Sequence, residues 1–170
     1  ESQLCQALKR CVPGQPILVE AESNKIGNIH VPPAFWAAMR NAPTIRVTAP
    51  IDARVNFLQR DYAHMINHPE LIMPLLSKLK HRHSAKKLAE WDQMIKCSDW
   101  PDFIKSLLES HYDPAYQRSG SARLISEIGI VVATTLDHDD INRLAEAIMA
   151  KSASMTTNQT AADSVNADLS

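Results

Sequence analysis

Glycine is scarce in this sequence: there are 4 among 170 residues, and none of them is followed by lysine. These residues therefore contain no phosphate-binding loop of the GxxxxGK[ST] type. Cysteine is also rare, and Cys5, Cys11 and Cys97 form no CxxC pair and no even-numbered disulfide framework. No apolar run approaches the roughly 18 residues that span a membrane, and no signal segment opens the chain. We therefore expect a cytoplasmic protein with no membrane partner.

Neither sign of charge is in excess, because 18 Lys and Arg residues are balanced by 19 Asp and Glu residues. The net charge of the chain does not favour binding to nucleic acid, so any basic surface must be local. We expect one domain over residues 1–150 and a disordered tail over residues 151–170, where large apolar side chains are few. The sequence opens inside a helical pattern over residues 2–11, which suggests a fragment of a longer chain.

Three strand–helix pairs follow one another along the sequence. The first is a strand over residues 16–20 with a helix that begins at Pro32 and Pro33. The second is TIRVTAP followed by IDARVNFLQRDY, and the third is SARLISEIGIVVATT followed by a helix that Asp137 can cap. Residues 63–110 are helical in pattern and form an insertion. This order predicts an α/β fold with a parallel sheet.

The segment LVEAESNKIG, residues 18–27, gathers polar groups where the first strand is expected to end. Acids such as Glu20 and Glu22 at the carboxyl edge of a sheet can hold Mg²⁺ or orient water. Lys25 can neutralise phosphate oxygens, and Gly27 permits close backbone approach. The alternative is that these charges only face solvent.

Other polar groups suggest binding surfaces elsewhere in the chain. Arg54 follows the second strand, where it can meet an anion or be solvated. The segment KLKHRHSAKK carries basic residues without an acid and can track a nucleic-acid backbone or form a solvated helix end; its cations are Lys78, Lys80, Arg82, Lys86 and Lys87. The segment HYDPAYQRS supplies Tyr112, Tyr116 and Arg118, either for binding or as a helix-terminating turn.

The histidines are the candidate ligands for zinc. His64 and His68 are four residues apart, and His81 and His83 are two apart. No cysteine or acid stands at a spacing that would complete a site, so we predict no metal.

Three segments taken in order, PILVEAESNKIGNIHVPPAFWAAMR, RVTAPIDARVNFLQRDY and LLESHYDPAYQRS, resemble the carboxyl-terminal half of bacterial tRNA 2-selenouridine synthase. The resemblance covers roughly residues 4–119. It implies a three-layer α/β fold of the P-loop NTPase type, with a parallel sheet that is incomplete at its amino terminus. In the family this domain is joined to a rhodanese-like domain with a catalytic cysteine. No catalytic role passes to Cys5, Cys11 or Cys97, which match neither that motif nor its position.

The resemblance also implies a reaction. The family converts wobble 2-thiouridine of tRNA to 2-selenouridine through S-geranyl-2-thiouridine, with geranyl diphosphate and selenophosphate as co-substrates and no permanently bound cofactor. The partners implied are tRNA and a selenophosphate-supplying enzyme. Because neither the rhodanese nor the Walker A segment lies within these residues, we expect the chain alone to be inactive.

The family's signature of Glu-Ser, basic residues and Ile-Gly is matched by Glu22, Ser23, Lys25 and Gly27, with Glu20 just before it and Asn24 where a basic residue is expected. By this likeness Glu20 or Glu22 orders a cation or the diphosphate, and Lys25, Arg54 and Arg118 offset anionic charge. Two alternatives are a tRNA-binding module without catalysis, which uses the basic cluster and the two tyrosines, and a P-loop kinase-like relative.

Overall fold

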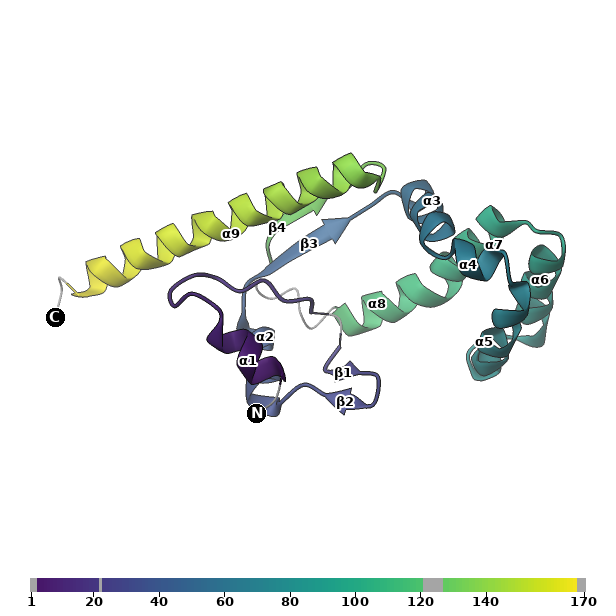
Figure 1. The fold of residues 1–170 in the computed structure, drawn as a ribbon, viewed down its shortest axis with the longest axis horizontal. Helices are drawn as coiled ribbons and strands as arrows, with labels where there is room; N and C mark the ends of the chain where they lie inside the picture. The colour runs from purple at the N-terminus through teal and green to yellow at the C-terminus, as the bar shows by residue number, and fades with distance from the viewer. Residues whose placement is uncertain (1–2, 22, 121–126, 168–170) are drawn as a thin grey trace. The chain divides into compact units, whose positions relative to one another are not determined.

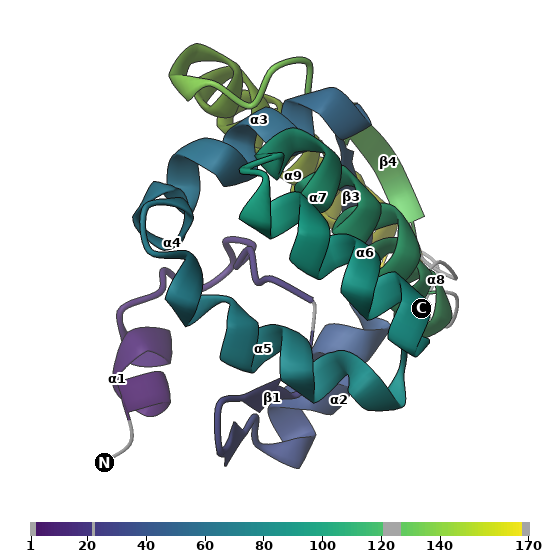
Figure 2. The same ribbon diagram turned by 90° about the vertical axis from the view of Figure 1, so that its right-hand side faces the viewer.

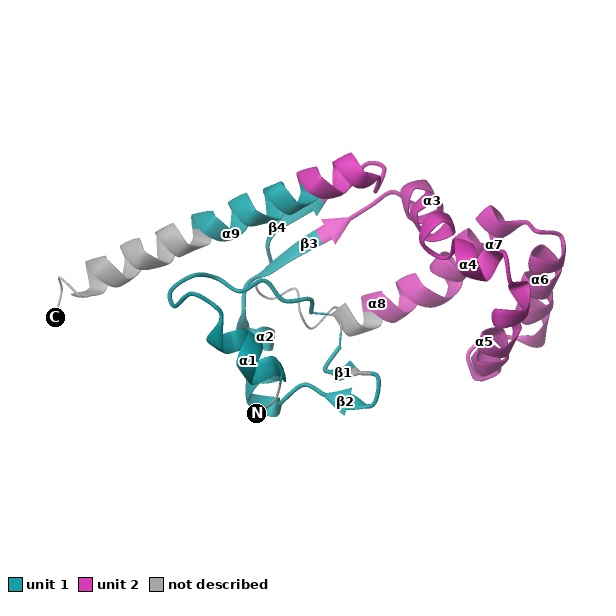
Figure 3. Cartoon of the chain, in the orientation of Figure 1, with its two compact units in different colours: residues 1–46, 125–131, 144–170 teal, residues 47–124, 132–143 magenta. Residues whose placement is uncertain are grey.

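The computed structural model describes residues 3–21, 23–120 and 127–167, and their side chains except those of residues 26, 118–120 and 155–167. The chain divides into two compact units (Figure 3). Unit 1 comprises residues 1–46, 125–131 and 144–170, and unit 2 comprises residues 47–124 and 132–143. The sequence predicts a single domain over residues 1–150. None of the helices described is both long and apolar enough to cross a lipid bilayer.

Unit 1 begins with helix α1 (Gln3–Lys9), within the helix predicted for residues 2–11. A short antiparallel hairpin follows, in which β1 (Lys25–Ile26) pairs with β2 (Ile29–His30) (Figure 1). Gly27 lies in the hairpin turn with φ of +59°, a backbone conformation that costs glycine little and other residues more. Helix α2 (Pro33–Asn41) then begins with proline in its first turn, as the sequence predicts.

The strand predicted over residues 16–20 is wrong. The structure assigns no strand there, and Ile17, Leu18 and Val19 are each about half exposed (51%, 50% and 46%). An apolar, β-branched run forms a strand only when a neighbour takes up its backbone hydrogen bonds. No described strand pairs with these residues, so Glu20 does not end a strand.

The second and third strand–helix pairs are confirmed. Strand β3 (Thr44–Thr48) leads into α3 (Ile51–Asp61), and β4 (Glu127–Val132) leads into α9 (His138–Ala167). The two strands pair with each other and run parallel, and Arg46 forms an ion pair with Glu127 across them. The part of the predicted third strand at residues 121–126 lies outside the described residues. The chain is therefore a mixed α/β protein with a short parallel sheet.

Helix α9 continues to Ala167, whereas the sequence predicts a disordered tail from residue 151. Low apolar content argues against burial of a segment, but it does not stop an established helix from growing. Each further residue adds one backbone hydrogen bond without a new nucleation cost. Residues 168–170 of the predicted tail lie outside the described residues.

Most of unit 2 consists of short helices, in agreement with the helical pattern over residues 63–110. In chain order they are α4 (Ala63–Ile66), η1 (Pro69–Leu71), α5 (Met73–Ser77), η2 (Lys78–His81), α6 (Ala85–Lys96), α7 (Trp100–Leu107), the π-helical η3 (Leu108–Tyr112) and α8 (Asp113–Gly120). Helices α6 and α7 lie side by side (Figure 2), and α7 also packs on α3. Their apolar faces enclose one cluster that includes Val55, Ile72, Trp91, Phe103 and Leu108.

The turn between β4 and α9 is organised by one carboxylate. Asp140 is 6% exposed, and its Oδ2 accepts backbone N–H groups of Thr134, Thr135 and Leu136 at 2.8–3.0 Å. Arg143 donates to the other oxygen. These bonds, first that from the Leu136 N–H, hold the pKa of Asp140 well below its ordinary value. As predicted, Asp137 caps α9 by accepting the Asp140 N–H at 2.9 Å.

Replacing Asp140 with Asn should lower the melting temperature by several degrees near neutral pH, because three backbone N–H groups then lose a charged acceptor. Since the folded pKa is depressed, this stabilisation is present above the ordinary value of about 3.8 and is lost as pH falls toward the folded pKa. The difference in melting temperature between the two proteins should therefore stay constant from pH 7 to about pH 4 and become smaller only as the pH falls further. Asp139→Asn, at the exposed neighbouring position, is the control; an equal effect of both changes would contradict the assignment.

Candidate functional site

The polar residues of LVEAESNKIG that the structure describes, Glu20, Ser23, Asn24 and Lys25, lie in unit 1 and are exposed. Ser23 accepts the backbone N–H of Lys25 at 3.1 Å through its hydroxyl, which fixes the entry to the hairpin. Lys25 stands opposite His30 in the register, and Gly27 forms the turn. Glu20 lies in the irregular segment before the hairpin. Glu22, also predicted to bind a ligand, lies outside the described residues.

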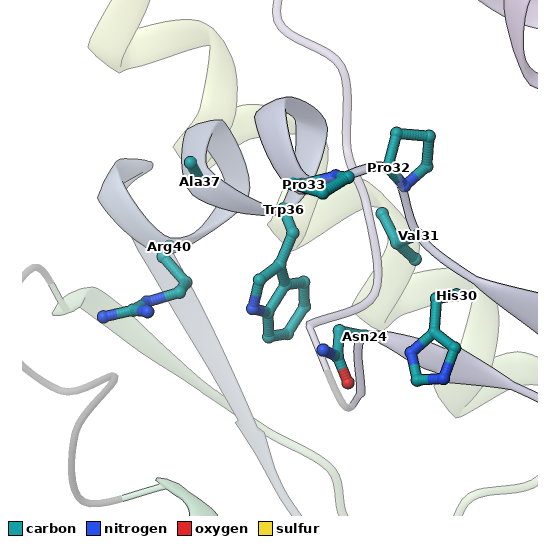
Figure 4. Close-up of a pocket in the computed structure, with 8 residues that line it drawn as sticks. All are labelled: Asn24, His30, Val31, Pro32, Pro33, Trp36, Ala37 and Arg40. Atoms are coloured by element: carbon teal, nitrogen blue, oxygen red, sulfur yellow. The ribbon is translucent and has the colours of Figure 1, made fainter.

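A pocket of about 460 Å³ lies beside this hairpin (Figure 4). Helix α2 supplies Trp36 and Arg40, one helical turn apart, so that both side chains reach the same side of the helix. The hairpin supplies Asn24 and His30. In the figure the indole of Trp36 lies between the side chains of Arg40 and Asn24. This pocket could not be predicted from the sequence, because its shape depends on how the hairpin packs beside α2.

Arg54, predicted to meet an anion, lies in the first turns of α3 and already has a partner. Its two terminal nitrogens donate to the two carboxylate oxygens of Asp113 at 3.0 and 2.5 Å, and both side chains are under one-third exposed. This paired geometry is the strong form of an ion pair. The position of Arg54 was predictable from the strand–helix order, but the pairing with Asp113 was not. The side chain of Arg118 lies outside the described residues.

Next to Arg54, unit 2 holds a groove of about 520 Å³ with an almost wholly apolar lining. Its walls come from α3, α4, α5, α7 and η3, with Phe57, Met65, Leu75, Trp100 and Leu107 among the lining residues. Tyr112 and Tyr116, predicted to stack on bases, also line it and are nearly half exposed. The groove therefore suits an apolar ligand with a polar or anionic end at Arg54.

The basic cluster is mainly a solvent-facing surface. Lys78, Lys80, Arg82 and Lys86 are exposed. Lys87 is partly buried, and its ammonium donates to Ser106 at 3.2 Å and pairs with Glu90. Lys78 and Lys80 flank Leu79, which lines the apolar groove. The groove and the basic residues are therefore neighbours in one unit.

The histidines do not gather as metal ligands. His68 bonds to Glu70 and His64 stacks on Tyr62, whereas His83 and His111 share a 3.0 Å hydrogen bond that no sequence signal predicted. Within the described ranges, no group of three or more His, Cys, Asp or Glu side chains is placed to hold a metal ion.

Comparisons with known proteins first define a class. Residues 1–72 match the family model of an AAA domain, which agrees with the mixed α/β fold and its parallel strands. No solved structure matches the chain.

That family model is the AAA domain of tRNA 2-selenouridine synthase, and the match covers residues 1–72 of the chain. A stretch of 45 residues is 44% identical to the tRNA 2-selenouridine synthase of Chromohalobacter salexigens, over 26% of this chain and 12% of that protein. A stretch of 131 residues is 27% identical to the enzyme of the same name from Shewanella loihica, over 62% of this chain and 35% of that protein. The chain thus spans about a third or less of the relatives it matches, and the resemblance read from its sequence is confirmed.

The bond between Arg54 and Asp113 should stabilise unit 2. In a double-mutant cycle with Arg54→Ala and Asp113→Ala, we expect a coupling of about 1 kcal/mol or more in the free energy of unfolding, because both groups are partly buried and doubly bonded. The matched control is Lys96 and Asp92, a more exposed pair within α6, for which about 0.3–0.5 kcal/mol is expected. Urea unfolding measures both cycles. Equal coupling energies for the two pairs would show that the paired geometry of Arg54 and Asp113 adds no stability.

Proposed function

We propose that this chain forms part of a tRNA 2-selenouridine synthase, a transferase that converts wobble 2-thiouridine to 2-selenouridine through an S-geranyl intermediate. The observation that carries the proposal is the match of residues 1–72 to the family's AAA domain. Both curated relatives are named tRNA 2-selenouridine synthase, which supports the formation of 2-selenouridine. In the whole protein, β3 and β4 belong to the larger parallel sheet of a three-layer α/β fold of the P-loop type. These 170 residues alone do not complete the reaction.

The groove of unit 2 supports the geranyl step. A geranyl chain is a flexible hydrocarbon that carries an anionic diphosphate at one end, and the groove is apolar with Arg54 among its lining residues. Its volume falls within the roughly 300–1,000 Å³ typical of small-ligand sites. A guanidinium has five N–H donors, and Asp113 takes one from each terminal nitrogen of Arg54. We assign the remaining donors of Arg54 to the diphosphate. The resemblance separately implies phosphate roles for Glu20, Glu22, Lys25 and Arg118.

Filling the groove should impair use of geranyl diphosphate. We expect Leu75→Trp in the intact enzyme to raise the KM for geranyl diphosphate by about tenfold, because an indole occupies part of the space for the hydrocarbon chain. Chromatography of geranylated tRNA measures the rate. The matched control is Leu71→Trp, at an equally exposed leucine outside the groove lining. Unchanged kinetics for Leu75→Trp would remove the groove from the reaction.

A second candidate function, a tRNA-binding module without catalysis, is favoured by the exposure of Lys78, Lys80, Arg82 and Lys86 beside a groove that contains two tyrosines. Phosphate contacts dominate nucleic-acid affinity, and exposed tyrosines can stack on unpaired bases. The modification activity of the intact enzyme discriminates the two functions, since a binding module performs none.

Changing the four exposed residues Lys78, Lys80, Arg82 and Lys86 to Ala should weaken tRNA binding at least about tenfold. It should also flatten the salt dependence, because binding through fewer phosphate contacts releases fewer counterions. Gel shifts at several salt concentrations measure both effects. Lys87 is kept in this variant because its bond to Ser106 also supports packing. Lys96→Ala together with Lys105→Ala is the control for charge lost elsewhere in unit 2. Undiminished binding by the four-site variant would exclude the cluster.

A further inference from the structure

The pocket of unit 1 has no role in the reaction proposed above, and its lining has a distinct chemistry. We propose that it binds a single unpaired nucleotide of an RNA strand, with the base stacked on Trp36 and a phosphate held by Arg40. The choice of RNA rests on the proposed function, in which tRNA is the substrate.

The stacking surface is the indole of Trp36. Trp91 is 0% exposed and Trp100 is 9% exposed, whereas Trp36 is only partly buried and lines the pocket. Nearby Pro32 and Pro33 give the pocket a stiff apolar wall. Aromatic rings of this kind are the usual platform for bases of single-stranded nucleic acid.

Polar groups flank the ring in a fixed arrangement. The side-chain amide of Asn24 carries both a donor and acceptors, which suits the edge of a base. Its backbone is held because the carbonyl of Asn24 accepts the Val31 N–H at 2.8 Å, next to the paired Lys25 and His30. Figure 4 shows the Asn24 amide and the Trp36 ring bordering the same space. The hairpin thus presents a hydrogen-bonding group beside the stacking surface.

Charge at the pocket selects an anionic ligand. The eight lining residues include Arg40 and His30 and contain no Asp or Glu. Arg40 lies across the indole from Asn24 in Figure 4, so a stacked base directed toward Asn24 would place its phosphate on the Arg40 side. A pocket of about 460 Å³ holds one nucleotide but not a base pair, and the nucleotide must therefore be unpaired. Proline-rich peptides also dock on aromatic pockets, but they do not account for Arg40, a cation in a lining that contains no Asp or Glu.

The test uses the full 170-residue chain and a five-nucleotide oligouridylate RNA. Because Trp91 and Trp100 are buried, stacking on Trp36 should dominate any quenching of tryptophan fluorescence by the RNA. We expect saturable quenching by the RNA, loss of that quenching in Trp36→Leu, and a Kd at least about fivefold higher for this variant by fluorescence anisotropy of labelled RNA. Trp36→Phe, which retains a ring, should recover most of the affinity. Circular dichroism of each variant checks that it is folded.

Arg40→Ala tests the phosphate contact. It should raise Kd and reduce the slope of log Kd against log salt by about 0.7, the value for one single-strand phosphate. Arg10→Ala removes the same charge from another exposed position of unit 1 and should leave the slope unchanged. Equal slopes in the Arg40 and Arg10 variants would overturn the phosphate assignment.

The proposal is overturned if Trp36→Leu binds the RNA as tightly as the parent chain, or if a proline-rich peptide quenches Trp36 and the RNA does not. Failure of the proposed function has a different signature. If the intact enzyme forms no 2-selenouridine while the oligonucleotide still quenches Trp36, the pocket assignment stands and the synthase assignment falls.

Discussion

The hydrogen bond from the Trp91 indole to Ser106 is the constraint on which unit 2 depends. Trp91 is fully buried, and the donor and acceptor atoms lie 2.9 Å apart. Without an acceptor, the desolvation penalty of the buried indole N–H would offset much of the free energy that is gained by burying the ring. The bond therefore fixes α6 against α7, and the indole also makes an edge contact with Phe103, which lines the groove. The shape of the groove wall thus follows from the satisfaction of one polar atom in the core.

Elements with local signals were predicted well from the sequence. Proline in the first turn of α2, the strand–helix order at β3 and α3, and the cap of α9 by Asp137 depend on neighbours in the chain, and all three are present. The strand expected over residues 16–20 depends on a distant partner, and no described strand pairs with it. Composition alone also underestimates α9, because a helix satisfies its backbone internally.

The candidate sites divide in the same way. The sequence identified Arg54 beside a strand end and an exposed basic cluster, because both follow from residue type and local order. It did not identify Asp113 as the partner of Arg54, 59 positions away, nor the groove, whose walls come from several helices. The pocket at Trp36 was missed for a related reason: its polar and aromatic residues come from a hairpin and a helix that each look ordinary alone.

The Asp140 turn also restricts how this sequence can change during evolution. Leu136 in that turn has a positive φ of 55° and donates its N–H to Asp140, while its carbonyl accepts from Arg60 at 2.9 Å. A side chain without an acceptor at position 140 would leave three converging N–H groups without this partner, so such a replacement destabilises the turn unless the turn is rebuilt. Leu136 itself lines the groove. Substitutions in this turn and in the groove lining should therefore occur together among homologues, even though Asp140 is not among the lining residues.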